Sequence, residues 1–424
     1  MSVRLPFYYG WFIAVGAGVN ASFVLGSAQF ALSTFLVPME EDLGWSRSVF
    51  FGALSVRFLL SGMLGPLVGP LADGVRAPRF IMPLGVVLMS GSLAAIRWVD
   101  SPWMFFALYG VVGAVATSIL HLNSWEAIIL KWFSRKRTRA LVIGGIGEGS
   151  GPMFSPLLVT LFIALFGWRD AWLWYGALFL VVLMPIALLV RTRPEQMGQL
   201  LDGNTSPWAD EQESTPTPVG DGDGDGDGEV SFTRGEAMHT QGFWVLLGIF
   251  TLSGIVITGF QAQWIPHFRD IGIGATAAAA AVSVYGALNI TSRVIWGSLL
   301  SRFPIRRLMV IHAIGAGAGV AFMVFVVDST VTLFIWAGYQ GLMLGVFFSL
   351  HTLISAQFFG RPHIGAIRGA MMPAASLSRA GGPLLLSSLR EWRGTYELAF
   401  VTVLGGWVVM AMATALARRP GGRR

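Results

Sequence analysis

Long apolar runs separated by short polar segments dominate this chain. A helix that crosses the hydrocarbon core of a bilayer needs about 20 mostly apolar residues. Twelve stretches meet that requirement: residues 9–37, 48–72, 80–99, 103–130, 140–166, 171–191, 242–267, 276–300, 307–327, 330–357, 364–389 and 395–417. A β-barrel would instead show segments of about ten residues with alternating apolar and polar side chains. The pattern therefore predicts an all-α membrane protein with twelve transmembrane helices.

The segment between the sixth and seventh spans has a different character. Residues 192–241 contain the run TPTPVGDGDGDGDGE, which is polar and rich in glycine. Such a composition cannot bury enough apolar surface to offset the entropy lost on folding. We therefore expect a flexible cytoplasmic linker over 192–241, an N-terminal six-helix bundle over 1–191 and a C-terminal six-helix bundle over 242–424.

The second half of the chain repeats the first. The matches, at an offset that grows from 228 to 231 residues, are Pro38 with Pro266, Asp42-Leu-Gly44 with Asp270-Ile-Gly272, His121 with His351, and Gly151-Pro152 with Gly382-Pro383. Parallel repeats of six spans are a plan used by secondary transporters, which place their site between the halves near the bilayer midplane. The repeat predicts two pseudo-symmetric bundles with a site between them.

Composition and charge support a membrane protein and give it an orientation. Hydrophobic residues make up 54% of the chain and charged residues 12%, whereas soluble domains are about a quarter charged. The loops on the side of both termini hold 20 of the 29 Lys and Arg residues. Basic loops stay in the cytoplasm, so we expect a multi-pass protein of the inner (cell) membrane with both termini cytoplasmic. The net charge of +6 then reflects topology and predicts no nucleic-acid partner.

Several kinds of chemistry are disfavoured by the residues present. The chain has no cysteine, which excludes thiol catalysis, disulfides and cysteine metal ligands. The glycine-rich run GGIGEGSG, residues 144–151, lies inside a predicted span, so we expect it to pack helices rather than to bind phosphate. No Ser-His-Asp, metal or nucleotide motif stands out. We therefore expect neither an enzyme, nor a cofactor, nor a metal site.

Ionisable residues inside the spans carry the functional prediction. They are Arg57, Arg293, Arg379, Glu126 and Glu148. A charge at the centre of a membrane helix costs about 3 kcal/mol or more, so it should face protein, water or a ligand. Arg379 is eleven residues from the nearest arginine on either side, a helix rise of about 16 Å that puts it near the midplane. Three fixed cations against two carboxylates leave a positive surplus, which favours an anionic substrate as the counter-ion.

These five residues have different expected roles. We expect Arg293 and Arg379 to bind substrate, with structural pairing as the alternative. Arg57 either joins them or forms a salt bridge with Glu148, which is also the candidate for proton coupling. Glu126 is about 7 Å of helix rise from a lysine at the cytoplasmic end, which favours a role at the helix end.

Neutral polar residues within the spans are further candidates for substrate contacts. They are His121, His351, Asn289, Gln29, Gln261 and Tyr285. The two histidines occupy matching positions in the repeat, where each could pack through hydrogen bonds, donate to a substrate or carry a proton. The amides, together with Asn123 and Gln263, could equally bridge helices.

Three stretches resemble known transporter signatures. GPLADGVRAPR, residues 69–79, resembles the loop signature of the major facilitator superfamily. EEDLGWSRS, residues 40–48, resembles the signature ahead of the second helix in monocarboxylate transporters and the related oxalate:formate antiporters. KWFSRKRTRALVIGGIGEGSG, residues 131–151, is similar to the start of the fifth helix in the same group.

The resemblance implies roles for particular residues. In that group an eighth-helix Arg holds the substrate carboxylate, a position that Arg293 matches, and the oxalate branch has a basic residue on the eleventh helix, where Arg379 stands. Monocarboxylate transporters also have an Asp four residues before the eighth-helix Arg and a Lys on the first helix. This chain has Asn289 at the former position and no basic residue within its first span, so Glu148 is the remaining candidate for proton coupling.

The resemblance and the charges together imply a secondary active transporter. We expect a monomer in membrane lipid that moves a small mono- or dicarboxylate by alternating access, coupled to protons or by exchange. The alternative is a drug or metabolite exporter of the same fold, with its arginines in structural pairs. A membrane sensor would be expected to carry a folded cytoplasmic domain, for which the linker is too short.

Overall fold

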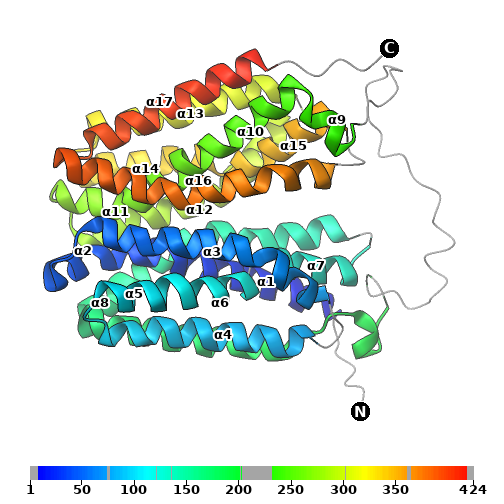
Figure 1. Ribbon diagram of the computed structural model, residues 1–424, viewed down its shortest axis with the longest axis horizontal. Helices are drawn as coiled ribbons and strands as arrows, with labels where there is room; N and C mark the ends of the chain where they lie inside the picture. The colour runs from blue at the N-terminus through cyan, green and yellow to red at the C-terminus, as the bar shows by residue number, and fades with distance from the viewer. Residues whose placement is uncertain are drawn as a thin grey trace.

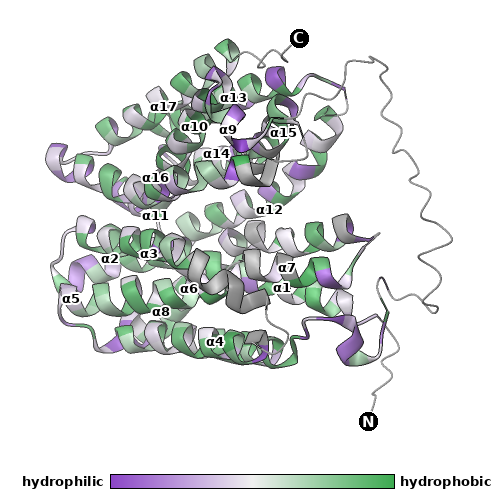
Figure 2. Cartoon of the chain, turned by 45° about the vertical axis from the view of Figure 1, so that its right-hand side comes forward, coloured by the Kyte–Doolittle hydropathy of each residue, from purple (hydrophilic) through white to green (hydrophobic). Residues whose placement is uncertain are grey.

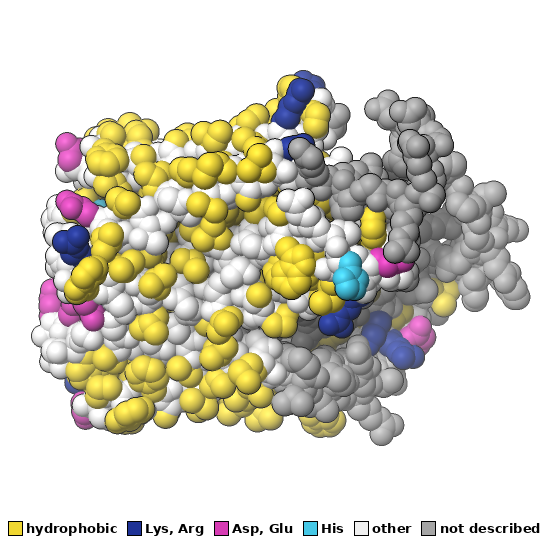
Figure 3. Space-filling view, turned by 45° about the horizontal axis from the view of Figure 1, so that its top comes forward, with side chains coloured by type: hydrophobic (Ala, Val, Ile, Leu, Met, Phe, Trp, Pro, Cys, Tyr) yellow, Lys and Arg dark blue, Asp and Glu magenta, His cyan; other side chains and the backbone are white. Residues whose placement is uncertain are grey.

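The computed structural model describes residues 8–73, 77–120, 122–134, 136–200, 202, 232–300, 302–360 and 364–417. Within these ranges the chain forms helices and no strand (Figure 1). Hydrophilic residues gather near the ends of the helices, whereas apolar residues cover their middles (Figure 2). The surface in Figure 3 likewise has an apolar middle and charged side chains at its two ends. Nine of the described helices are long and apolar enough to cross a membrane, and the predicted all-α membrane fold is confirmed.

The first half of the chain forms the lower bundle in Figure 1, coloured blue to cyan and green-blue. Its elements are α1 (Gly10–Leu25), η1 (Gly26–Ala31), α2 (Leu32–Leu43), α3 (Arg47–Asp73), α4 (Ala77–Ala95), η2 (Ile96–Trp98), α5 (Pro102–Phe105), η3 (Phe106–Val112), α6 (Gly113–Leu120), α7 (Leu122–Trp132) and α8 (Arg137–Leu189). α8 contains two of the predicted spans, and Gly167, where φ is 74°, marks the break between them. The six predicted spans of this half all coincide with helix.

The second half forms the upper bundle. After η4 (Pro194–Met197), its elements are α9 (Arg234–Met238), α10 (Gln241–Ser253), η7 (Gly254–Gly259), α11 (Phe260–Asp270), α12 (Ala275–Leu300), α13 (Ile305–Val326), α14 (Thr330–Leu344), α15 (Phe347–Phe359), α16 (Ile364–Arg393) and α17 (Glu397–Leu416). These again coincide with six predicted spans. Most of the predicted linker lies outside the described residues, so its boundaries at 192 and 241 stay predictions.

The repeat is visible in the helix geometry. η1 and η7 are six-residue π-helical segments, and each begins at a glycine. Gly254 follows Gly26 by 228 residues, the same offset that aligns the two sequence halves. π-helical turns are rare and are frequent at functional sites. Their presence at matching positions confirms the predicted pseudo-symmetry and draws attention to the first helix of each bundle.

The glycine-rich run on α8 packs against α1. A Cβ atom added to Gly147 would lie 1.8 Å from the carbonyl oxygen of Gly18, and one added to Gly151 would lie 2.9 Å from that of Ser22. In the second bundle a Cβ atom on Gly382 would lie 3.0 Å from Cα of Ile255. Only glycine allows helix backbones to approach this closely. The run is therefore a helix-packing motif, as predicted.

The two bundles have separate apolar cores and meet along three pairs of helices. One core is formed almost entirely by residues of the first half and the other by residues of the second. Across the interface α2 contacts α11, α3 contacts α16, and α8 contacts α12. We call the end of the molecule where α7, α9 and α15 lie the linker end (Figure 1). A substrate site between the bundles must be built from these helices and from the π-helical segments η1 and η7, which adjoin α2 and α11.

Candidate functional site

A row of polar side chains crosses the interface between the bundles. Nε2 of Gln29 on η1 donates to the carbonyl oxygen of Thr258 and to Oε1 of Gln261, at 3.3 Å each. Gln261 donates to the Tyr285 hydroxyl at 2.7 Å, and Asn289 donates to the same hydroxyl at 3.3 Å. The structure thus brings together four of the predicted site residues. We call Gln29, Gln261, Tyr285 and Asn289 the polar row.

Arg293 continues this row along α12. Tyr285, Asn289 and Arg293 are spaced by four residues, so they lie on one face of the helix. The Arg293 side chain is half-buried, and its Nη1 donates to the carbonyl oxygen of Gly145 on α8 at 3.2 Å. Gly145 has no side chain, which allows the guanidinium to reach the α8 backbone. Arg293 therefore links the second bundle to the first.

Arg379 reaches the first bundle from another helix. Its guanidinium carbon lies 5.7 Å from the ring centroid of Phe58 on α3, and its side chain is half-buried. This is a cation–π contact across the α3–α16 interface. Arg293 and Arg379 thus belong to α12 and α16, and both extend toward the first bundle. An arginine keeps its charge in any environment, so the interface holds two permanent cations.

Two predicted residues can be placed only in part. The backbone of Glu148 lies on α8 between Gly145, which accepts from Arg293, and Gly149, where an added Cβ atom would lie 2.6 Å from Ile290 of α12. This stretch of α8 therefore faces α12. The Glu148 side chain and the whole of His121 lie outside the described residues, as do the side chains of Asn123 and Glu126. Their predicted roles stay predictions.

Arg57 lies inside the first bundle. It is fully buried, its Nε donates to Thr117 at 3.0 Å, and its Nη2 donates to the Ser27 hydroxyl at 3.2 Å. Its guanidinium carbon also lies 4.9 Å from the ring centroid of Tyr109. All of these partners belong to the first bundle, and none of its described partners is a carboxylate. The surroundings of Arg57 are therefore those of a packed bundle core rather than of the interface.

His351 and Gln263 also lie within a bundle. His351 is buried, its Nδ1 is 2.9 Å from the carbonyl oxygen of Phe347, and its ring packs against Phe250 at 4.8 Å between centroids. Gln263 donates to the carbonyl oxygen of Pro383 at 3.1 Å. These are contacts of helix packing within the second bundle.

A cluster of charges that the sequence did not predict joins the bundles at the end opposite the linker end. Arg47, at the start of α3, is 4% exposed, and its Nε lies 2.8 Å from the Glu40 carboxylate. Its two terminal nitrogens donate to both oxygens of Asp270, at 2.8 and 2.7 Å, and Nη1 also donates to the Tyr396 hydroxyl at 2.8 Å. Arg390 pairs with Asp270 at 3.2 Å. We call Glu40, Arg47, Asp270, Arg390 and Tyr396 the Arg47 cluster.

Further hydrogen bonds close the interface at the same end. The backbone N–H of Ser48 donates to Glu391 at 2.7 Å, and the hydroxyls of Ser48 and Ser387 lie 3.5 Å apart. Deeper in the interface, Ser33 of α2 donates to the carbonyl oxygen of Ala262 of α11 at 3.0 Å. In this structure the two bundles are therefore joined at the end opposite the linker end. The sequence had singled out parts of this cluster, Asp270 in the repeated Asp-x-Gly and Glu40 and Arg47 in the stretch EEDLGWSRS, but neither pattern says which residues pair across the bundles.

Comparison with known proteins agrees with this architecture. The family model described as Major Facilitator Superfamily matches residues 19–383. The oxalate:formate antiporter of Oxalobacter formigenes is 22% identical over 97% of this chain and 92% of its own, and monocarboxylate transporter 11 of Mus musculus is 25% identical over 88% and 89%. A solved bacterial homolog of the human lysosomal transporter Spinster superposes with a TM-score of 0.70 at 14% identity, covering 97% of this chain and 96% of its own. At that identity the structural likeness establishes the fold.

Proposed function

Because the chain belongs to the major facilitator superfamily, we propose that it carries a small organic anion, a mono- or dicarboxylate, between its two bundles by alternating access. The observation that carries the proposal is the pair Arg293 and Arg379, which extend from two helices of one bundle to the other. Similar proteins include an oxalate:formate antiporter and several monocarboxylate transporters, which supports the same substrate class.

The chemistry of these side chains suits carboxylates. A guanidinium group donates two parallel hydrogen bonds to a carboxylate, a stronger and more specific contact than a lysine makes. Two such groups could bind the two ends of a dicarboxylate or chelate one small anion. The amides of the polar row, Gln29 and Gln261 among them, would donate to the remaining oxygens. A bound anion would also offset the cost of holding two cations away from water.

Binding would favour movement of the two bundles because both arginines also contact the first bundle. Arg293 bonds to a carbonyl oxygen of α8 and Arg379 stacks on Phe58 of α3, so a substrate carboxylate would compete with both contacts. A ligand shifts a conformational equilibrium by the difference in its affinities for the two states. We propose that exchange of these contacts for the substrate couples occupancy to the opening and closing of the interface.

Uptake by purified protein in proteoliposomes tests the proposal. We expect saturable uptake of labelled oxalate, formate or lactate, and we expect Arg293→Lys and Arg379→Lys each to weaken carboxylate binding about tenfold or more, since hydrogen bonds to charged groups contribute about 1.5–3 kcal/mol. The matched control is Arg393→Lys, because Arg393 is exposed and stacks on Trp392. Carboxylate uptake that persists unchanged in both variants would reject the arginine site. Saturable uptake of lipophilic cations instead would favour the exporter.

Coupling is tested on the same preparation. Glu148→Gln should abolish any dependence of uptake on a pH gradient if Glu148 carries the proton in symport. An exchanger would show uptake that depends on carboxylate loaded inside the vesicle and not on pH. Dependence on pH that survives in Glu148→Gln would place the proton carrier elsewhere.

A further inference from the structure

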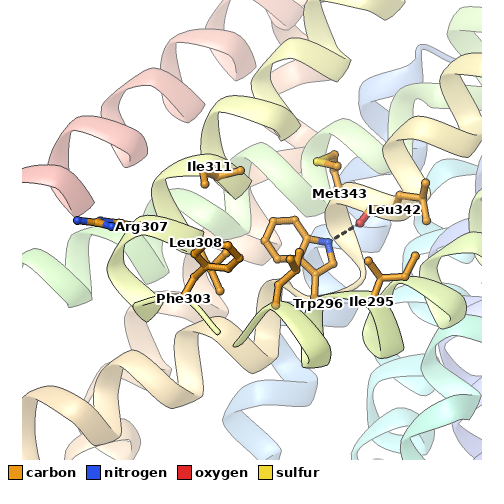
Figure 4. A pocket seen from close by; sticks show the side chains of 9 residues that line it. Ile295, Trp296, Phe303, Arg307, Leu308, Ile311, Leu342 and Met343 are labelled. Atoms are coloured by element: carbon orange, nitrogen blue, oxygen red, sulfur yellow. Dashed lines mark hydrogen bonds between the residues drawn. The ribbon is translucent and has the colours of Figure 1, made fainter. Parts of the chain in front are cut away.

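An apolar pocket of about 490 Å³ opens between α12, α13 and α14 (Figure 4). Ile295, Phe303 and Ile311 line it and are 47%, 50% and 56% exposed. Trp296 forms its floor, where its indole N–H donates to the carbonyl oxygen of Leu342 at 2.8 Å. Since this bundle crosses a membrane, exposed apolar side chains here face the bilayer rather than water.

The pocket runs from the linker end of the helices into the hydrocarbon region. Phe303 lies in the turn between α12 and α13, and Ile311 is six residues past the start of α13, about 9 Å by helix rise. Leu342 and Met343 lie near the end of α14, in the interior of its span. Half of a hydrocarbon core measures about 15 Å. The pocket thus follows the direction and depth of an acyl chain in one leaflet.

A cation stands at the linker end of this pocket. Arg307 lies at one end of the lining residues, on the far side of Phe303 and Leu308 from Leu342 and Met343 (Figure 4). Its side chain is exposed. The adjacent Arg306 instead donates to the carbonyl oxygens of Thr414 and Ala415 at the end of α17. Arg306 is therefore occupied in capping a helix, whereas Arg307 is presented at the mouth of the pocket.

We propose that this pocket binds an anionic phospholipid, with one acyl chain along Ile295, Trp296 and Ile311 and the phosphate on Arg307. An apolar channel with a cation at its membrane-surface end matches a lipid with a negative headgroup, because each part of the lipid meets its complement. The loops at this end hold most of the basic residues of the chain, which attract anionic lipid to the surface. The proposal is independent of the transported substrate.

A lipid at this position would contact the helix that carries the substrate candidates. Trp296 is three residues from Arg293 on α12 and lies against the pocket. Occupation of the pocket would therefore hold α12, α13 and α14 together beside the interface. The lipid would act as a structural ligand of the second bundle.

Native mass spectrometry of the delipidated full chain in detergent tests this site. Phosphatidylglycerol and phosphatidylcholine with the same acyl chains are added separately. We expect phosphatidylglycerol to bind about fivefold more tightly, and Arg307→Gln to remove that preference, since one basic residue near an anionic surface contributes about 1 kcal/mol. Ile311→Trp, which fills the pocket, should weaken the binding of both lipids.

Matched controls separate the pocket from the general surface. Ile314→Trp changes a residue of α13 that is 60% exposed and does not line the pocket, and Arg79→Gln removes an exposed cation near the linker end of α4. We expect both controls to bind lipid as the wild type does. Equal retention of the two lipids by the wild type, or unchanged lipid binding in Arg307→Gln or Ile311→Trp, would overturn the proposal. A thermal-unfolding measurement adds one more test. If inorganic phosphate alone stabilised the protein as much as phosphatidylglycerol does, the proposal would also be overturned.

Discussion

At the scale of single residues, the three arginines within the spans differ in what surrounds them. Arg293 and Arg379 contact the opposite bundle, whereas the described partners of Arg57 all belong to its own. Arg57 Nη1 is buried and has no hydrogen-bond partner in the described part of the chain. The hydroxyls of Ser27 and Thr117 and the face of Tyr109 replace water around the rest of the guanidinium. These contacts indicate a structural role in the first bundle.

Substitution of Arg57 tests that role. Arg57→Met should leave carboxylate affinity within about twofold and change stability little, because a buried charge can be replaced by an apolar side chain of similar volume. Arg57→Ala should lower the free energy of unfolding by about 2–5 kcal/mol, since it also leaves a cavity. Thermal unfolding with and without carboxylate measures both effects. Arg293→Met is the control that should stay folded and lose binding. A folded Arg57→Met that binds no carboxylate would return Arg57 to the substrate site.

The sequence singled out the members of the polar row because polar residues within a span are rare and costly in hydrocarbon, and their contact with substrate stays a prediction. Gln29, Gln261, Tyr285 and Asn289 were each identified that way, and they meet across the interface. The groups that Gln29, Arg293 and Arg379 contact could not be identified from the sequence, because the carbonyl oxygens of Thr258 and Gly145 and the ring of Phe58 are groups that recur along every helix. Which backbone carbonyl faces a guanidinium depends on how two helices pack, and hydropathy carries no information on that.

At the scale of helices, the spans follow from the bilayer, whereas their interruptions do not. A membrane helix satisfies its own backbone, so apolar length alone predicts where it lies. The π-helical segments η1 and η7 insert an extra residue per turn without any change in hydropathy. α8 runs through two spans that the sequence analysis had separated, and only the backbone angles of Gly167 mark the break between them. Periodicity therefore predicted the elements and their repeat, and local backbone geometry had to come from the structure.

The α1–α8 contact gives a prediction at this scale. Gly147→Ala should lower the thermal midpoint in detergent and the yield of monodisperse protein, because its Cβ atom would collide with the Gly18 carbonyl. Overpacking of this kind costs about 1–3 kcal/mol or more.

Gly91→Ala on α4 is the matched control, since an added Cβ atom there has no described neighbour within 4 Å. Alanine is favoured over glycine in a helix by about 1 kcal/mol, so this control should be neutral or stabilising. Equal thermal midpoints for Gly147→Ala and Gly91→Ala would show that α1 and α8 can move apart to fit the added methyl group without loss of stability.

At the scale of the whole molecule, the Arg47 cluster holds the two bundles together at one end. Its members lie at the ends of spans, where sequence analysis counts charges as topological signals, and Arg47 is 223 residues from Asp270. Their pairing appears only when the bundles are placed side by side. Because both carboxylates bind one buried guanidinium, loss of a partner would leave a charge poorly compensated. We therefore expect this cluster to favour the state that is closed at this end.

Cross-linking tests closure directly, since the chain has no cysteine of its own. The hydroxyls of Ser48 and Ser387 lie 3.5 Å apart across the interface, within reach of a disulfide. Ser48→Cys with Ser387→Cys should cross-link on mild oxidation, and transport should stop until a reductant is added, because alternating access requires this end to open. Each single cysteine variant should transport under both conditions.

The same cross-link measures the contribution of the cluster. Asp270→Asn should slow disulfide formation about tenfold, since the loss of a hydrogen bond to a charged group costs about 1.5–3 kcal/mol and shifts the bundles toward the open state. Asp42→Asn is the matched control, because Asp42 aligns with Asp270 in the sequence repeat. Asp42 pairs instead with Arg169 of its own bundle, at 3.2 Å. Asp42→Asn should cross-link at the unmodified rate. If both variants, or neither, slow cross-linking, closure does not depend on the contact between Asp270 and Arg47, and the apolar packing of α3 on α16 must hold this end shut.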